Sequence, residues 1–180
     1  MPHRQMMTAR HLTDRTESCI REYLADAERN PNANRKQMYL DLANGAFVLW
    51  NRLMQDLTDP ADPLATAEFE ADQARLDALF GDASSPPERA PSSPRSPGAI
   101  VSVSLNYAQI TAQALNEVLR QLDAAAHLGP DEAELARARA CGAFDLWRRL
   151  VNDLLAQRDA VVLGYEYDEA RLRAMLGLPR

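Results

Sequence analysis

The chain has 180 residues, of which 46% are hydrophobic and 26% are charged, a balance typical of a soluble globular protein rather than a disordered one. The formal net charge is −6, so we do not expect a general surface for nucleic acid. The sequence shows neither a signal peptide nor an apolar run of about 18 residues. We therefore expect a cytoplasmic protein that does not span a membrane.

Apolar periodicity predicts three helices in the first half of the chain, over residues 8–29, 33–57 and 66–80. The segment NPN at 30–32 separates the first two, because proline disrupts a continuing helix. The segment TDPADP at 58–63 contains two prolines and ends the second helix.

A proline- and serine-rich segment follows at residues 82–98. It reads DASSPPERAPSSPRSPG and has no apolar periodicity, so it cannot bury enough surface to offset the entropy lost on ordering. We predict an exposed, flexible linker there. It divides the chain into a first unit, residues 1–81, and a second unit, residues 99–180.

The order of helices recurs after the linker. Helices are predicted near residues 104–126, from a break at 128–131 to about 158, and near 167–176. The second unit therefore contains three helices of similar spacing.

The sequence itself also recurs. GAFVLWNRLMQDL at residues 45–57 and GAFDLWRRLVNDL at residues 142–154 are identical at nine of thirteen positions. ARLDALFG at 74–81 likewise aligns with ARLRAMLG at 170–177. We interpret the chain as a tandem duplication of a three-helix unit.

The central helix of each unit has one broad apolar face. Its members are Met38, Leu42, Phe47, Leu49, Trp50, Leu53 and Leu57 in the first unit, and Leu135, Phe144, Leu146, Trp147, Leu150 and Leu154 in the second. Three short helices make a thin core, so we predict that both units pack into one all-α bundle. Glycine is unfavourable within a helix, yet Gly45 and Gly142 occupy equivalent helical positions in both units. We therefore expect a neighbouring helix to approach closely at both.

No catalytic, cofactor-binding or metal-binding residues are predicted. His3, His11 and His127 lack a metal-ligand spacing and are expected on the surface or at helix ends. The chain also lacks glycine-rich phosphate loops and the nucleophile-elbow motif. Cys19 and Cys141 are too few for a disulfide framework, so we expect buried free thiols.

Charged residues near the helix ends have simple structural explanations. The acidic segment 56–62 lacks the ligand pattern of a calcium loop and suits helix-end and N-cap roles. Four-residue spacing predicts salt bridges from Arg52 to Asp56 and from Arg149 to Asp153.

The aromatic residues allow a second interpretation besides core packing. One aromatic face of the bundle would remain open to receive an amphipathic helix from a partner protein. The residues predicted to bind such a partner are Phe47, Trp50, Met54, Phe144, Trp147 and Val151.

Two segments resemble a known family. LWNRLMQDLTDPADPL at residues 49–64 is similar to the middle of FlaF-type flagellar regulators of alphaproteobacteria, where an LW-containing helix runs into a DL-x-DP-x-NPL-like turn. SLNYAQ at 104–109 is similar to the family's tyrosine-alanine-glutamine opening. The family usually has one copy, and its threonine-serine-proline-arginine continuation is absent here. The resemblance implies a cytoplasmic protein that binds flagellin or controls flagellin synthesis and export.

Three functions remain open from the sequence. The first is a non-enzymatic helical adaptor or regulator that binds another protein, with flagellin as the partner that the resemblance implies. The second is an enzymatic or small-molecule-binding bundle whose site lies between the units and uses polar residues such as Arg52, Asp56, Arg149 and Asp153. The third is a structural subunit that forms homo-oligomers through the same faces.

Overall fold

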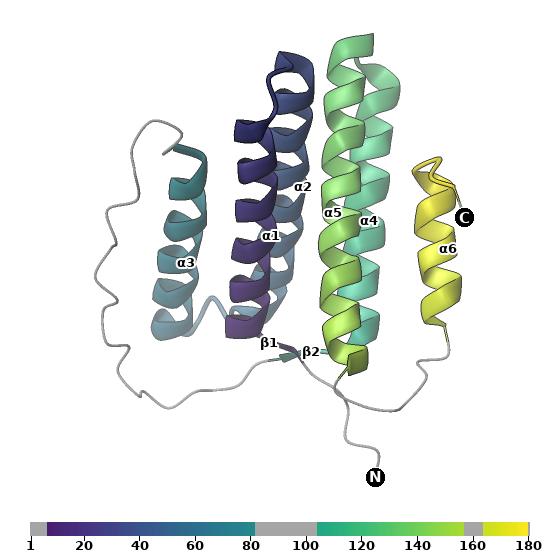
Figure 1. The fold of residues 1–180 in the computed structure, drawn as a ribbon. Coiled ribbons are helices and arrows are strands. Elements are labelled where there is room, and N and C mark those ends of the chain that lie inside the picture. The colour runs from purple at the N-terminus through teal and green to yellow at the C-terminus, as the bar shows by residue number, and fades with distance from the viewer. Residues whose placement is uncertain (1–6, 82–103, 157–163, 180) are drawn as a thin grey trace.

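The computed structural model describes residues 7–81, 104–156 and 164–179. Six helices account for most of these residues, as Figure 1 shows: α1 (Ala9–Arg29), α2 (Ala33–Leu57), α3 (Pro63–Gly81), α4 (Tyr107–His127), α5 (Pro130–Ala156) and α6 (Tyr165–Met175). Two-residue strands β1 (Met7–Thr8) and β2 (Ser104–Leu105) form one antiparallel pair. The predicted linker and His3 lie outside the described residues, while the all-α prediction is confirmed.

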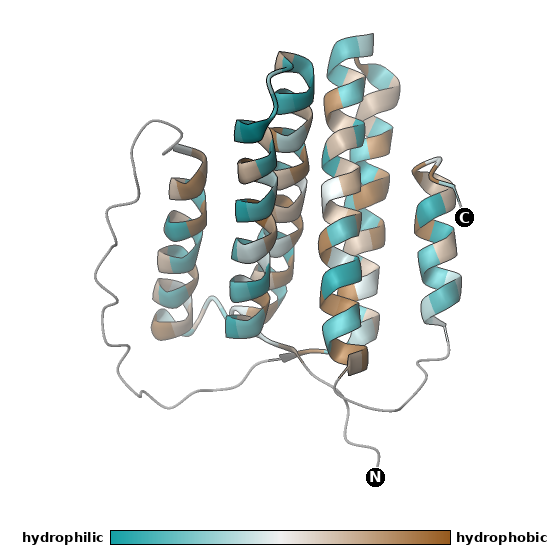
Figure 2. Ribbon diagram, viewed as in Figure 1, coloured by the Kyte–Doolittle hydropathy of each residue, from teal (hydrophilic) through white to brown (hydrophobic). Residues whose placement is uncertain are grey.

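The helices α1, α2, α4 and α5 stand side by side as a bundle, and α3 and α6 lie at its opposite edges (Figure 1). The helices α2 and α5 pack directly against each other, while α1 packs on α2 and α4 packs on α5. Hydrophilic and hydrophobic residues alternate along most helices (Figure 2), as expected where one face of each helix is buried. The predicted helical bundle is therefore confirmed.

A single large core cluster draws on both halves of the chain. Trp50 and Trp147, the only tryptophans, have no exposed surface and are its largest fully buried side chains. Other fully buried members include Leu49, Leu53, Leu76, Leu146, Leu150 and Leu172. Burying side chains of this size contributes roughly 1.5 to 3 kcal/mol each, so the tryptophans anchor the packing of both halves.

The central helices cross at their glycines. A Cβ built on Gly45 would lie 2.8 Å from the Cα of Arg139, and one built on Gly142 would lie 2.9 Å from the Cα of Leu42. The two contacts are reciprocal, because Gly142 and Arg139 each lie 97 positions after Gly45 and Leu42. Such exchange of equivalent residues is characteristic of a two-fold related interface. The predicted close approach at both glycines is confirmed.

Two predicted helix starts need correction. The helix α3 begins at Pro63 rather than at residue 66, because the Asp62 carboxylate accepts hydrogen bonds from the backbone N–H groups of Leu64 (2.9 Å) and Ala65 (3.3 Å). Proline suits this first helical position, where no intrahelical donor is required. The helix α6 begins at Tyr165, two residues earlier than predicted.

A third helix start, that of α4, lies later than predicted. Asn106 caps the helix in a capping box with Gln109, so the helix begins at Tyr107 rather than at residue 104. The preceding Leu105 pairs instead with Met7 in the short strand pair. Among the described residues, no helix has the length and apolarity needed to cross a membrane.

Candidate functional site

Aromatic rings join α3 to α2. Phe69 of α3 stacks on Trp50 with ring centroids 5.8 Å apart, and Trp50 stacks on Phe47 at 5.7 Å. Phe80 meets the edge of Phe47 at 5.9 Å. The indole Nε1 of Trp50 donates to the Thr13 hydroxyl of α1 at 3.1 Å, which satisfies its one polar group. We call Phe47 and Trp50 the first aromatic face.

The second unit builds the same arrangement from different residues. Tyr165 of α6 stacks on Trp147 at 5.8 Å, and Trp147 stacks on Phe144 at 5.8 Å. The Trp147 Nε1 donates to the Thr111 hydroxyl of α4 at 3.0 Å. We call Phe144 and Trp147 the second aromatic face. Each unit therefore covers its own aromatic face with its own third helix.

The residues predicted to bind a partner lie on or beside these two faces. Five of them are buried inside the chain: Trp50, Met54, Phe144, Trp147 and Val151. Phe47 is partly exposed. The sequence suggested that one aromatic face stays open. In this structure α3 covers the first face and α6 covers the second. The partner role of these residues stays a prediction.

The sequence match between the third helices extends toward the N-terminus beyond residues 74–81 and 170–177. FEADQARLDALFG at 69–81 and YEYDEARLRAMLG at 165–177 are identical at seven of thirteen positions. Both begin with the aromatic residue that stacks on a tryptophan. That shared ring position was missed, although its place seven residues before Leu76 and Leu172 is visible in the sequence.

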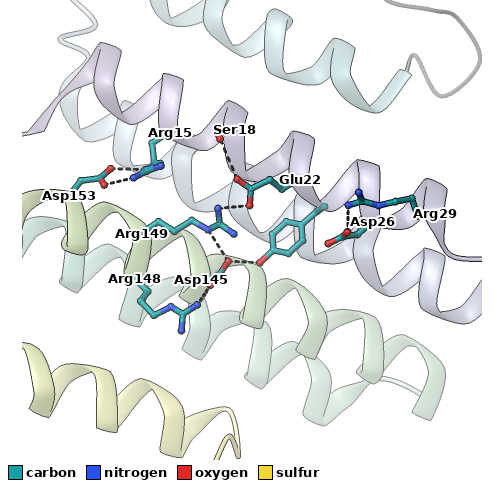
Figure 3. Close-up of polar contacts among 10 residues, drawn as sticks. Arg15, Ser18, Glu22, Asp26, Arg29, Asp145, Arg148, Arg149 and Asp153 are labelled. Atoms are coloured by element: carbon teal, nitrogen blue, oxygen red, sulfur yellow. Dashed lines mark hydrogen bonds and ion pairs between the residues drawn. The ribbon is translucent and has the colours of Figure 1, made fainter. Parts of the chain in front are cut away.

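Polar contacts hold α1 against α5 at one seam between the units (Figure 3). The Asp145 carboxylate accepts hydrogen bonds from Tyr23 Oη (2.7 Å), Arg149 Nε (3.0 Å) and Arg148 Nη2 (2.8 Å). Arg149 Nη1 also donates to Glu22 at 2.6 Å. Burial alone would raise the pKa of Asp145, but the Tyr23 hydrogen bond and the Arg149 charge outweigh it and lower that pKa.

The cysteines differ in exposure. Cys19 is fully buried in this seam, and desolvation raises the pKa of its thiol to about 12 although Arg149 opposes the shift. Cys141 is only partly buried, and desolvation raises its pKa as well. Both are free thiols, and the raised pKa values keep them in the unreactive protonated form. Buried thiols were predicted for both, and the prediction is confirmed for Cys19, while Cys141 is only partly buried.

The predicted salt bridges within α2 and α5 are wrong. Asp153 instead binds Arg15 of α1, whose Nε lies 2.6 Å away, and Arg149 binds Glu22 of α1. At the other seam, Arg52 Nε donates to Glu117 of α4 at 2.6 Å. The side chains reach a neighbouring helix because they lie where two helices meet, and pairs there are less solvated than exposed pairs along one helix.

The seam between α2 and α4 centres on one buried carboxylate. Glu117 is 1% exposed and accepts hydrogen bonds from Arg52, from Arg120 Nη2 (2.6 Å) and from Gln121 Nε2 (2.7 Å). A nearby open depression of about 190 Å³ is lined by Phe47, Val48, Asn51, Arg52 and Gln55. It is smaller than the roughly 300 Å³ usual for a small-molecule site.

The polar residues named for a site between the units do not converge. Arg149 and Asp153 lie at the seam of α1 and α5, while Arg52 and Asp56 lie at the seam of α2 and α4. Figure 1 shows these two seams on opposite faces of the bundle. Within the part of the chain that the structure describes, no three His, Cys, Asp or Glu side chains are placed to hold a metal ion.

Comparisons with models of protein families, with curated proteins and with solved structures each found no match.

Proposed function

We propose that this chain is a non-enzymatic helical adaptor that acts by binding another protein. The supporting observation is that the fold builds the same aromatic face twice and covers each copy with a helix from the edge of the bundle. A surface that accepts an apolar helix in one chain has the shape and chemistry to accept one from a partner. The proposal keeps the predicted cytoplasmic location.

We also infer that the two units arose by duplication of one three-helix segment. Three kinds of contact recur between equivalent residues: the glycine crossing, the indole hydrogen bonds and the aromatic stacks. Sequence identity supports the same relation between α2 and α5 and between α3 and α6. The proline- and serine-rich segment 82–98 would then join the copies.

Flagellin is the first partner to test, because the resemblance to FlaF regulators points to it. The purified full-length chain is titrated with purified flagellin and followed by calorimetry and size-exclusion chromatography. We expect a stoichiometric complex and its recovery when the tagged chain is purified from its native cell. An unrelated tagged helical bundle of similar charge is the control for non-specific capture.

Two results together would contradict the adaptor function. One is the absence of a complex with flagellin, and the other is recovery of the tagged chain alone from native cells at both low and high salt. Binding of a different protein through the aromatic faces would keep the adaptor function and replace flagellin as its partner.

A further inference from the structure

The helix α6 is held to the bundle by few buried groups. It has eleven residues, and Leu172 is its one buried residue. A helix of this length is only marginally stable in water by itself, so most of its stability must come from contacts with α4 and α5. Those contacts therefore decide whether α6 stays in place.

Three side-chain contacts fix α6 on the second aromatic face. Tyr165 stacks on Trp147, and Asp168 accepts a hydrogen bond from Tyr107 Oη of α4 at 2.6 Å. The Arg173 guanidinium lies 5.9 Å from the centre of the Phe144 ring, within cation–π range. An aromatic ring, a carboxylate and a cation on another helix would make the same contacts.

The helix α3 shows which features such a helix needs. Both third helices place an aromatic residue on the tryptophan, a fully buried leucine seven positions later, and apolar residues at the tenth and eleventh positions after the ring. The members are Phe69, Leu76, Leu79 and Phe80 in α3, and Tyr165, Leu172 and Met175 in α6 followed by its C-cap Leu176. These spacings lie on one face of a helix.

Of the two covering helices, α6 is the more easily displaced. The helix α3 has 19 residues, and its Arg75 pairs with Glu17 of α1 at 3.2 Å in addition to the aromatic contacts. The helix α6 is shorter, and within the described part of the chain its one hydrogen bond to the rest of the bundle is the one that Asp168 accepts from Tyr107. Replacing α6 by another helix therefore breaks fewer contacts than replacing α3.

We propose that the second aromatic face is the partner site, and that the partner is an amphipathic helix that binds there in place of α6. Its sequence carries an aromatic residue, a leucine seven positions later, and apolar residues ten and eleven positions after the aromatic one. This inference rests on the proposed adaptor function and specifies its surface and the chemistry of its ligand.

The test uses the full-length chain and a fluorescein-labelled synthetic peptide with the sequence of residues 164–180. Fluorescence anisotropy measures the affinity of the peptide for the wild-type chain and for the variant Leu172→Asp. A charge at this fully buried position loosens the chain's own α6. We expect the variant to bind the peptide at least about tenfold more tightly, because the tethered helix no longer competes at its high effective concentration.

Matched controls separate helix exchange from non-specific binding. Arg171→Asp introduces the same charged residue at the adjacent exposed position and should bind the peptide as the wild type does. Leu172→Ala should give an intermediate affinity and replaces Leu172→Asp if circular dichroism shows that the latter is unfolded. A peptide with aspartate at the position of Leu172 should not bind.

A peptide that binds no variant, or binds all of them equally, overturns the inference. Because this test needs no cellular partner, its failure leaves the adaptor function standing. Failure to find any cellular partner contradicts the adaptor function without changing the peptide result.

Discussion

The backbone of Gly45 lies directly against the backbone of Arg139, so closely that an added Cβ would come within 2.8 Å of the Arg139 Cα. A backbone neighbour cannot rotate away as a side chain can, so the two helices would have to separate. The same contact occurs between Gly142 and Leu42. The crossing of α2 and α5 therefore depends on two glycines in equivalent places.

Replacement of either glycine by alanine should destabilise the fold sharply. Overpacking typically costs about 1 to 3 kcal/mol, and we expect Gly45→Ala and Gly142→Ala at or above the upper end. Thermal unfolding followed by circular dichroism measures the effect. Gly81→Ala is the matched control, because nothing lies within 4 Å of a Cβ there. Melting temperatures equal to that of the control would contradict close packing at the crossing.

Removing one partner of the ion pair between Asp41 and Arg139 should cost more stability than removing both. Asp41 is 2% exposed and accepts from Arg139 Nε at 2.8 Å, whereas the equivalent positions hold Ala138 and Leu42. Arg139→Leu alone removes the guanidinium that donates to the buried Asp41 carboxylate, and it should lower the free energy of unfolding by about 1 to 3 kcal/mol.

The double variant Asp41→Ala, Arg139→Leu places at these positions the residues found at the equivalent positions, Ala138 and Leu42, and should recover most of that loss. Urea unfolding of the wild type, both single variants and the double variant gives the coupling energy. Additive costs would show that the two side chains do not depend on each other.

The two indole hydrogen bonds should contribute equally. Thr13→Val and Thr111→Val keep the side-chain shape but leave Trp50 and Trp147 with unpaired buried donors, at a cost of about 1 to 3 kcal/mol each. Thr16→Val is the control, because its buried hydroxyl bonds only the Leu12 carbonyl of its own helix. Chemical denaturation monitored by tryptophan fluorescence gives the three values, and a cost in only one half would contradict the equivalence.

The sequence predicted those parts of the fold that depend on nearby residues. The helices α1 and α2 end immediately before the proline-containing segments 30–32 and 58–63, as predicted. The close approach at the glycines was predicted because glycine is unfavourable within a helix. The partners of Arg52 and Arg149 were not predictable from four-residue spacing, since they depend on which helices meet at each seam. Phe69 and Tyr165 were also missed, because each stands among charged residues in a weakly amphipathic helix.

The carboxylate of Asp145 should make stability depend on acid pH. Its pKa is lowered in the folded state, so its contribution is fully present above its unfolded pKa of about 3.9 and is lost as the pH falls through the lower folded value. Asp145→Asn should therefore lower the free energy of unfolding at pH 7 by about 1 to 3 kcal/mol, and the difference from wild type should shrink below about pH 4.

Urea unfolding over a pH series measures this dependence. Asp123→Asn, at an exposed position on α4, is the control and should differ little from wild type at every pH. A difference for Asp145→Asn that is constant across the acid range would show that its cost comes from packing rather than from charge.

Cleavage between the units tests most directly whether both share one core. A protease site is inserted within residues 82–98 of the full-length chain, the folded protein is cut, and its mass is measured by size-exclusion chromatography with light scattering. Because α2 packs on α5 across the glycine crossing, we predict that the two fragments elute together as one particle with the mass of the uncut chain and a single unfolding transition. Fragments that separate and unfold cooperatively on their own would contradict a shared core.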